Sequence, residues 1–126
     1  MLVKQIKFSE ASKDRLSRLK SKTGIHNWNV LCRWAFCYSI RENTVPTDVQ
    51  LELNSNLEMS WFTFGGEYCD IYELIMIDWC YSHDIAPTKE NLSKYFKLHL
   101  ERGIAYLSAT NLVKDLEDLV DLALEG

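Results

Sequence analysis

The stretch that decides the fold is residues 2–41, LVKQIKFSEASKDRLSRLKSKTGIHNWNVLCRWAFCYSIR. Residues 2–8 follow a period of two, the pattern of a short β-strand. Residues 10–22 carry acidic side chains early and basic side chains late, which suits the dipole of an α-helix. Ser9 can cap this helix at its start, and Gly24 can end it in the left-handed conformation. The stretch therefore begins with a strand followed by a basic helix.

A second helix is predicted over residues 28–40, with Asn27 as its N-cap. It is apolar on nearly all sides, so we expect it to be buried on several sides, in the core and in a subunit contact. Arg33 is the only charged residue within this helix, and we expect it either to pair with a carboxylate or to contact a phosphate at a subunit interface. The residues that we assign to the core or to an oligomer contact are Trp28, Leu31, Arg33 and Trp34.

The rest of the chain reads as a turn-rich segment followed by helices. Turn signals occupy the linker region 42–58, and residues 59–64 suit a short strand stopped by two glycines. Helices are expected over 67–83, from 87 to 102 with Gly103 as the stop, and over 112–123. We predict a mainly α-helical single domain, residues 1–126, in which a basic strand-helix-helix unit (1–41) is joined through the linker to a compact, acidic helical part (59–126).

Charge divides along the chain. Residues 1–41 hold nine basic and two acidic residues, a net charge of +7, whereas residues 42–126 hold five basic and sixteen acidic residues, a net charge of −11. A basic segment of this kind suits a polyanion such as DNA, because counterions are released when phosphates are neutralised. On charge alone, a solvated helix face is an equally good interpretation. The candidate DNA contacts are Lys4, Lys7, Lys13, Arg15, Arg18, Lys20 and Lys22.

Catalytic and metal signals are weak. Cys80 and His83 have the spacing of one helical face, with Cys69 or His99 as further ligands, but no CxxC or HExxH motif occurs. Core packing explains the pair better, so we expect no metal, no cofactor and no catalytic residues. Nor is there a signal core or an apolar run long enough to span a membrane, and the cysteines lie in apolar helical stretches, so we expect a cytoplasmic protein with reduced thiols.

The order strand, basic helix, turn, apolar helix resembles the ribbon-helix-helix class of DNA-binding proteins, in which two chains pair their strands. An unpaired strand and an all-apolar helix both need a partner, which this class supplies. Depending on register, Lys4 and Gln5 or Lys7 would then read base edges. A transcription regulator or antitoxin of this class is the alternative function.

Several strings make a second resemblance more specific. These are residues 6–9 (IKFS), 15–20 (RLSRLK), 23–25 (TGI), 27–29 (NWN), 31–36 (LCRWAF), 65–66 (GG) and 99–104 (HLERGI). Together they resemble the DndE family, the small subunits of the bacterial DNA sulfur-modification system, over nearly the whole chain. The run from Asn27 to Phe36, with two tryptophans, a cysteine and an arginine, is the most distinctive part.

The resemblance implies a non-enzymatic subunit that binds double-stranded DNA and prefers nicked DNA. It also implies a homo-oligomer, such as a tetramer, acting with sulfurtransferase-like and ATPase subunits in a phosphorothioation and restriction-modification system. Two other hypotheses remain open. The protein could be an enzyme, a nuclease or sulfur carrier, that uses Cys80 and His83, or an assembly adaptor that does not bind DNA itself.

Overall fold

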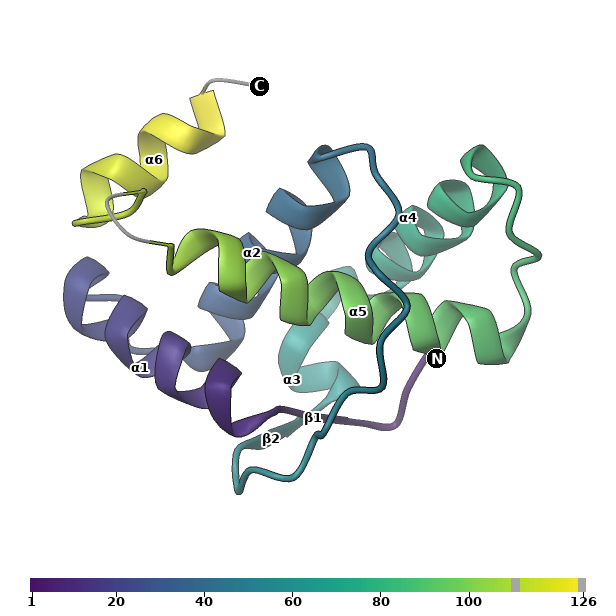
Figure 1. The fold of residues 1–126 in the computed structure, drawn as a ribbon, viewed down its shortest axis with the longest axis horizontal. Helices are drawn as coiled ribbons and strands as arrows, with labels where there is room; N and C mark the ends of the chain where they lie inside the picture. The colour runs from purple at the N-terminus through teal and green to yellow at the C-terminus, as the bar shows by residue number, and fades with distance from the viewer. Residues whose placement is uncertain (110–111, 125–126) are drawn as a thin grey trace.

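Helices dominate the computed structural model, which describes residues 1–109 and 112–124 (Figure 1). The elements are β1 (Gln5–Lys7), α1 (Glu10–Thr23), α2 (Trp28–Arg41), β2 (Glu58–Ser60), α3 (Trp61–Gly65), the 3-10 turn η1 (Gly66–Tyr68), α4 (Cys69–Ser82), α5 (Lys89–Leu107) and α6 (Leu116–Leu124). This confirms the predicted mainly helical single domain with a short strand and two helices at its start.

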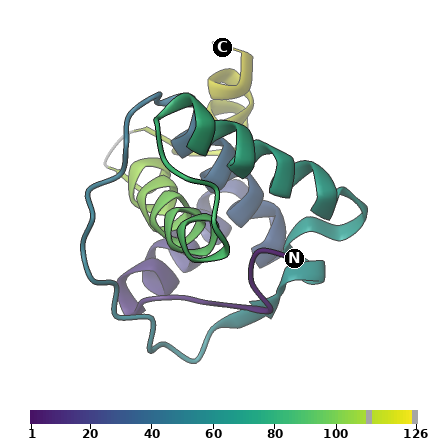
Figure 2. The same ribbon diagram turned by 90° about the vertical axis from the view of Figure 1, so that its right-hand side faces the viewer.

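The core forms where α2 and α5 pack together, with α1, α3 and α4 around them (Figures 1 and 2). Its centre is aromatic: the ring of Phe96 on α5 lies 5.2 Å from those of Phe36 and Phe64 and 5.3 Å from that of Trp61, measured between centroids. Edge-on and tilted packing of such rings adds to the free energy of burying their surface. The apolar character of α2 is thus largely explained within one chain.

Strand β1 finds its partner in the same chain. It pairs antiparallel with β2, placing Gln5 opposite Ser60, Ile6 opposite Met59 and Lys7 opposite Glu58. The ribbon-helix-helix comparison led us to expect pairing with a second chain, and this detail was wrong. A segment more than fifty positions later supplies the hydrogen bonds that an isolated strand lacks.

The segment expected as a strand over residues 59–64 is a strand only as far as Ser60. The Ser60 side chain accepts a hydrogen bond from the backbone N–H of Thr63 at 3.0 Å, which caps α3. Trp61 and Phe64, three positions apart, are then buried on the same side of this short helix. Capping and aromatic burial together favour a helix over continued strand.

Gly103 does not end α5, contrary to expectation; the helix continues to Leu107. A Cβ atom at position 103 would lie 1.8 Å from the carbonyl oxygen of Ala35 on α2. The glycine is therefore required because two helix backbones approach closely, a role that local sequence does not distinguish from a helix stop.

Residues 42–57, which we call the strap, contain no helix or strand and cross the outer side of α5 (Figure 2). Arg102 of α5 donates hydrogen bonds to the Thr44 hydroxyl at 2.9 Å and the Thr44 carbonyl at 3.1 Å. Lys94 of α5 forms an ion pair with Asp48 at 2.7 Å. The expected linker is thus fastened onto the domain and leads the chain back to β1.

Candidate nucleic-acid interface

Helix α1 is held firmly enough to present its charges in a fixed arrangement. The Ser9 hydroxyl accepts a hydrogen bond from the Ser12 backbone N–H at 3.1 Å and donates one to Glu101 of α5 at 2.6 Å. At the other end Gly24, with φ of 74°, donates its N–H to the Lys20 carbonyl. Both predicted caps are therefore present, and a carboxylate from α5 fixes where α1 begins.

The basic residues of α1 lie along two separate edges of its exposed face. Leu16 and Leu19 turn inward, and Arg15, Arg18 and Lys22 follow the i, i+3, i+7 spacing of a single edge. Arg18 and Lys22 are exposed, and in the described part of the chain no carboxylate lies within 4.0 Å of either. These two cations are available to a phosphate.

Three of the predicted contacts already have neighbours within the protein. The Lys13 ammonium donates a hydrogen bond to the Asn56 side-chain oxygen on the strap. The Lys20 ammonium lies over the Trp28 ring, 4.8 Å from its centroid, a cation–π contact. Arg15 is half-buried and lines a hollow of about 350 Å³ beneath the strap, which Glu101 and Arg102 also line. The predicted site thus divides into free and occupied cations.

The outer face of the β1–β2 sheet is less basic than the sequence suggested. Lys4 and Lys7 are exposed, as expected. Lys7, however, lies opposite Glu58, and the second position on this face pairs Gln5 with Ser60. A carboxylate opposite Lys7 offsets its charge, since opposite charges across antiparallel strands attract. This face of the sheet therefore carries little net positive charge for contact with a groove of DNA.

The α2 residues assigned to the core or to an oligomer contact divide between the two. Leu31 is fully buried in the core, whereas Trp28, Arg33 and Trp34 are half-buried. Within residues 1–109 and 112–124, no carboxylate lies within 4.0 Å of Arg33, so the expected ion pair is not among the described contacts. Asn27 starts α2 with its backbone carbonyl, without a side-chain cap.

A buried polar network, missed by sequence reasoning, joins α2 and α5. The Arg102 Nε donates to the Ser39 hydroxyl at 2.8 Å, and that hydroxyl lies 2.8 Å from His99 Nδ1. The Ser39 hydroxyl and His99 Nδ1 thus share one hydrogen bond, in which the donor is set by which ring nitrogen of His99 carries the proton. Burial, the Arg102 cation and His83 lower the pKa of His99 to about 3. No local sequence motif predicts this network, because Ser39 lies some sixty positions from His99 and Arg102.

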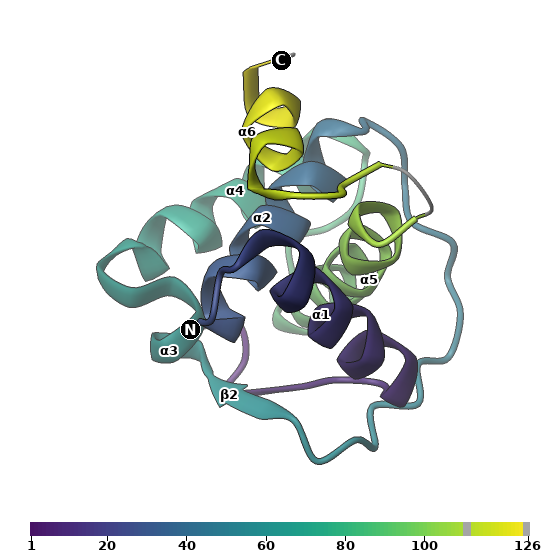
Figure 3. The ribbon, with the colours of Figure 1, turned by 90° about the vertical axis from the view of Figure 1, so that its left-hand side faces the viewer.

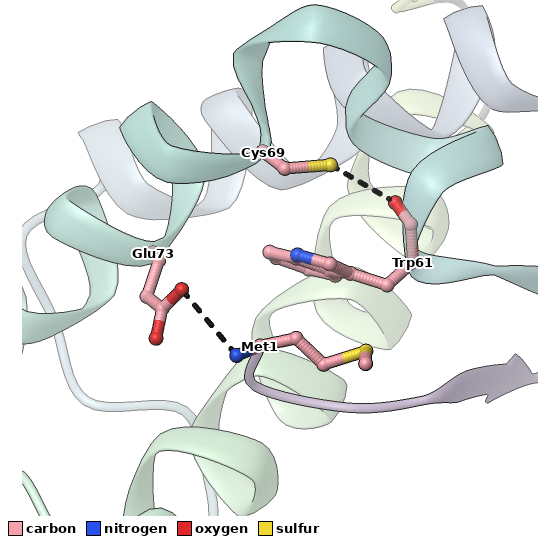
Figure 4. Close-up of polar contacts among 4 residues, drawn as sticks. All are labelled: Met1, Trp61, Cys69 and Glu73. Atoms are coloured by element: carbon pink, nitrogen blue, oxygen red, sulfur yellow. Dashed lines mark hydrogen bonds and ion pairs between the residues drawn. The ribbon is translucent and has the colours of Figure 1, made fainter.

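The cysteine and histidine candidates have separate structural partners. His83 Nδ1 donates to the Trp79 carbonyl at 2.8 Å, and Cys69 donates to the Trp61 carbonyl at 3.5 Å (Figure 4). Near Cys69, the amino group of Met1 lies 3.8 Å from Glu73 (Figure 4). Among the described residues, no three His, Cys, Asp or Glu side chains are grouped as metal ligands would be.

Three of the four cysteines lie in surroundings that disfavour the thiolate. Burial raises the pKa of Cys32, and burial also raises the pKa of Cys37 and of Cys80. A nucleophilic or metal-binding cysteine needs the opposite shift, because the thiolate is the reactive form.

The described helices include none long and apolar enough to cross a membrane.

Comparisons with known proteins agree on one family. The family model of the DNA sulphur modification protein DndE matches residues 5–115. No curated protein matches the chain. Among solved structures, DndE from Escherichia coli B7A, involved in DNA phosphorothioation modification, has 28% identity and a TM-score of 0.69, covering 85% of this chain and 98% of that one. A DndE variant in which two glycines are replaced by lysine has 27% identity and a TM-score of 0.65, covering 85% and 99%. The chain therefore belongs to the DndE family of DNA sulphur modification proteins.

Proposed function

We propose that the chain is a non-catalytic subunit of a bacterial DNA phosphorothioation complex and that it binds double-stranded DNA through α1. The observation that carries the proposal is the exposed pair Arg18 and Lys22, on one edge of a helix fixed at both ends. Phosphate contacts by such cations bind DNA without regard to sequence. Membership of a family involved in DNA phosphorothioation supports DNA as the polyanion.

Nicked double-stranded DNA is the preferred form in this proposal. A nicked duplex bends more easily than an intact one, so fitting it against several basic surfaces costs less deformation energy. The free cations on α1 and the exposed Lys4 near β1 lie on different elements. A duplex that contacts both gains from bending toward the protein.

We assign the sulfur chemistry to other subunits of the complex. The raised pKa values of the buried Cys32 and Cys80 support this assignment, since burial disfavours the reactive thiolate. In this proposal the chain holds DNA in the cytoplasm while partner subunits replace a phosphate oxygen with sulfur.

We also propose that the chain forms a homo-oligomer, with a tetramer as one arrangement, through the outer face of α4. Ile71, Leu74 and Tyr81 lie on one side of this helix and are 52%, 63% and 68% exposed, and Tyr68, 50% exposed, precedes them. Contiguous apolar side chains of this kind are commonly covered by another protein. The exposed Asp78 lies between Leu74 and Tyr81 on this side of the helix, and the exposed Asp70 lies at its edge, so the surface that covers α4 must pair or solvate these carboxylates.

A ribbon-helix-helix regulator or antitoxin is the second candidate. In that class the paired strands of two chains enter the major groove. Here β2 of the same chain pairs with β1 and brings Glu58 to its exposed face, which favours binding through α1 instead.

The deciding experiment is a binding titration with nicked, intact and single-stranded DNA of one sequence, at several salt concentrations. We expect the nicked duplex to bind most tightly. A plot of the logarithm of the binding constant against the logarithm of the salt concentration should fall with a slope of about −0.9 for each phosphate neutralised. Competition by DNA of unrelated sequence should be equally effective. Equal affinity for the three forms would refute the nick preference, and sequence-specific competition would favour the regulator.

A further inference from the structure

The outward face of α2 forms a groove that the DNA-binding proposal does not use. Its side chains follow the spacing i, i+3, i+4, i+7, i+8, i+11, and are Val30, Arg33, Trp34, Cys37, Tyr38 and Arg41. Two hollows of about 310 and 210 Å³ lie along this face, and both are lined by Trp34 and Cys37. They form one apolar surface, which we call the α2 groove. In Figures 1 and 3, α2 lies between α4 and α6.

One end of the α2 groove shows what kind of segment it accepts. Helix α6, which packs mainly against α1, borders this end of the groove, with Leu119 and Leu122 buried and the acidic Glu117 and Asp121 exposed. Arg41 donates a hydrogen bond of 2.7 Å to the carbonyl of Leu122, near the C-terminal end of α6. A cation is favourable at that end of a helix, because carbonyls are left unpaired there.

In the described part of the chain, the other end of the groove is lined only by residues of α2 and α4. Val30, Arg33 and Trp34 line it from α2, and Tyr72 lines it from α4. Arg33 lies two turns before Arg41 on the same helix face. Within the described residues its guanidinium has no hydrogen bond or ion pair, so this cation is unpaired beside an apolar hollow.

We propose that this second end binds an amphipathic helix of another protein, with leucine-like side chains on one side and carboxylates at its edge. Arg33 would meet a carboxylate or the C-terminal carbonyls of the incoming helix, as Arg41 meets those of α6. Laying an apolar helix face into a groove, with a charge at the rim to fix its direction, is a recurrent mode of recognition. The inference does not depend on DNA binding.

The test uses the full-length chain and a fluorescent peptide with the sequence of residues 112–124, LVKDLEDLVDLAL, as the acidic amphipathic probe. Fluorescence anisotropy should show saturable binding, with a Kd on the order of 10 to 100 µM for one short helix. Arg33→Glu should weaken it at least about tenfold and Arg33→Gln by less, because a rim charge is reversed or only removed. Lys89→Glu, the same kind of charge change at the exposed start of α5, should leave it unchanged.

A charge exchange makes the test stricter. A peptide with lysine in place of Glu117, Asp118 and Asp121 should bind the Arg33→Glu variant better than the unaltered chain. Equal binding of both peptides to both chains would overturn the proposal. So would loss of binding in Arg41→Glu but not Arg33→Glu, since the peptide would then displace α6. A dimer abolished by Trp34→Ser, without peptide binding, would also overturn it, because a second copy would be the occupant.

Discussion

Gly103 of α5 faces the carbonyl oxygen of Ala35 on α2 so closely that a Cβ atom would lie 1.8 Å from it. Gly103→Ala must therefore push apart the two helices that form the core, at a cost of about 3 kcal/mol in the free energy of unfolding. Urea unfolding followed by circular dichroism would measure it. The control is Gly24→Ala: φ is +74° there with nothing within 4 Å of the added atom, so only the left-handed backbone penalty of about 1 kcal/mol applies. Equal losses would contradict this account.

Reversing the two free cations of α1 should weaken DNA binding. We expect Arg18→Glu combined with Lys22→Glu to reduce affinity for nicked duplex and to lower the salt slope by about two, one for each lost phosphate contact. A salt series by anisotropy would measure both. Lys89→Glu, at the start of α5, makes the same kind of charge change far from α1 and is the control. An unchanged slope in the double variant would exclude these contacts.

The buried His99 should make the protein less stable in acid. Its folded pKa is about 3, below the ordinary value of 6.5, so the unfolded chain binds the proton more readily. Stability contributed by neutral His99 is complete above pH 6.5 and is lost as pH falls toward 3, with a slope of at most about 1.4 kcal/mol per pH unit. Urea unfolding at several pH values should show this slope, diminished in His99→Gln. His26→Gln, at an exposed position, should retain it.

Arg102 should hold the strap against α5. Replacing it with Met removes donors to Ser39 and Thr44, so we expect a loss of about 2 to 3 kcal/mol in unfolding free energy. Hydrogen exchange of strap amides should also accelerate. Lys94→Met, which breaks an exposed ion pair with Asp48 and a surface cation–π contact with Tyr95, should cost less than about 1 kcal/mol. If both variants lost the same stability, the Arg102 network would not be the main fastening.

The exposed face of α4 should carry self-association. Leu74→Glu should lower the oligomer mass measured by light scattering, because a charge would enter an apolar contact. Val49→Glu, with 52% of the residue exposed on the strap, introduces the same side chain away from α4. It should leave the mass unchanged; a lowered mass in the control instead would place the contact elsewhere.

Local signals predicted local structure well. Ser9 and Gly24 mark the limits of α1 in the sequence and cap it in the structure, because each cap needs only nearby atoms. The partner of β1 could not be predicted in this way, since β2 lies more than fifty positions later. Gly103 was misread for the same reason: its neighbour Ala35 is distant in sequence.

The sequence predicted which residues form the candidate site, but not how their side chains are placed. The sequence identifies the basic residues of α1, and Arg18 and Lys22 are exposed as a contact with DNA requires. That Lys20 lies over Trp28 and Lys13 contacts Asn56 depends on how α1 packs against other elements. Arg102 lies in one of the strings that resemble the family, but its role could not be predicted, since its partners Ser39 and Thr44 belong to another part of the chain.

The pairing of β1 with β2 also affects how the chain folds during synthesis. Ile6 emerges from the ribosome early, yet the strand opposite it is complete only when Ser60 has been made. Contacts between distant positions form late, because a long loop must close first. The amino-terminal strand and helix therefore stay partly exposed until the second half of the chain has been synthesised. A fragment that ends at Arg41 should accordingly stay unfolded or aggregate, although it contains the whole strand-helix-helix sequence.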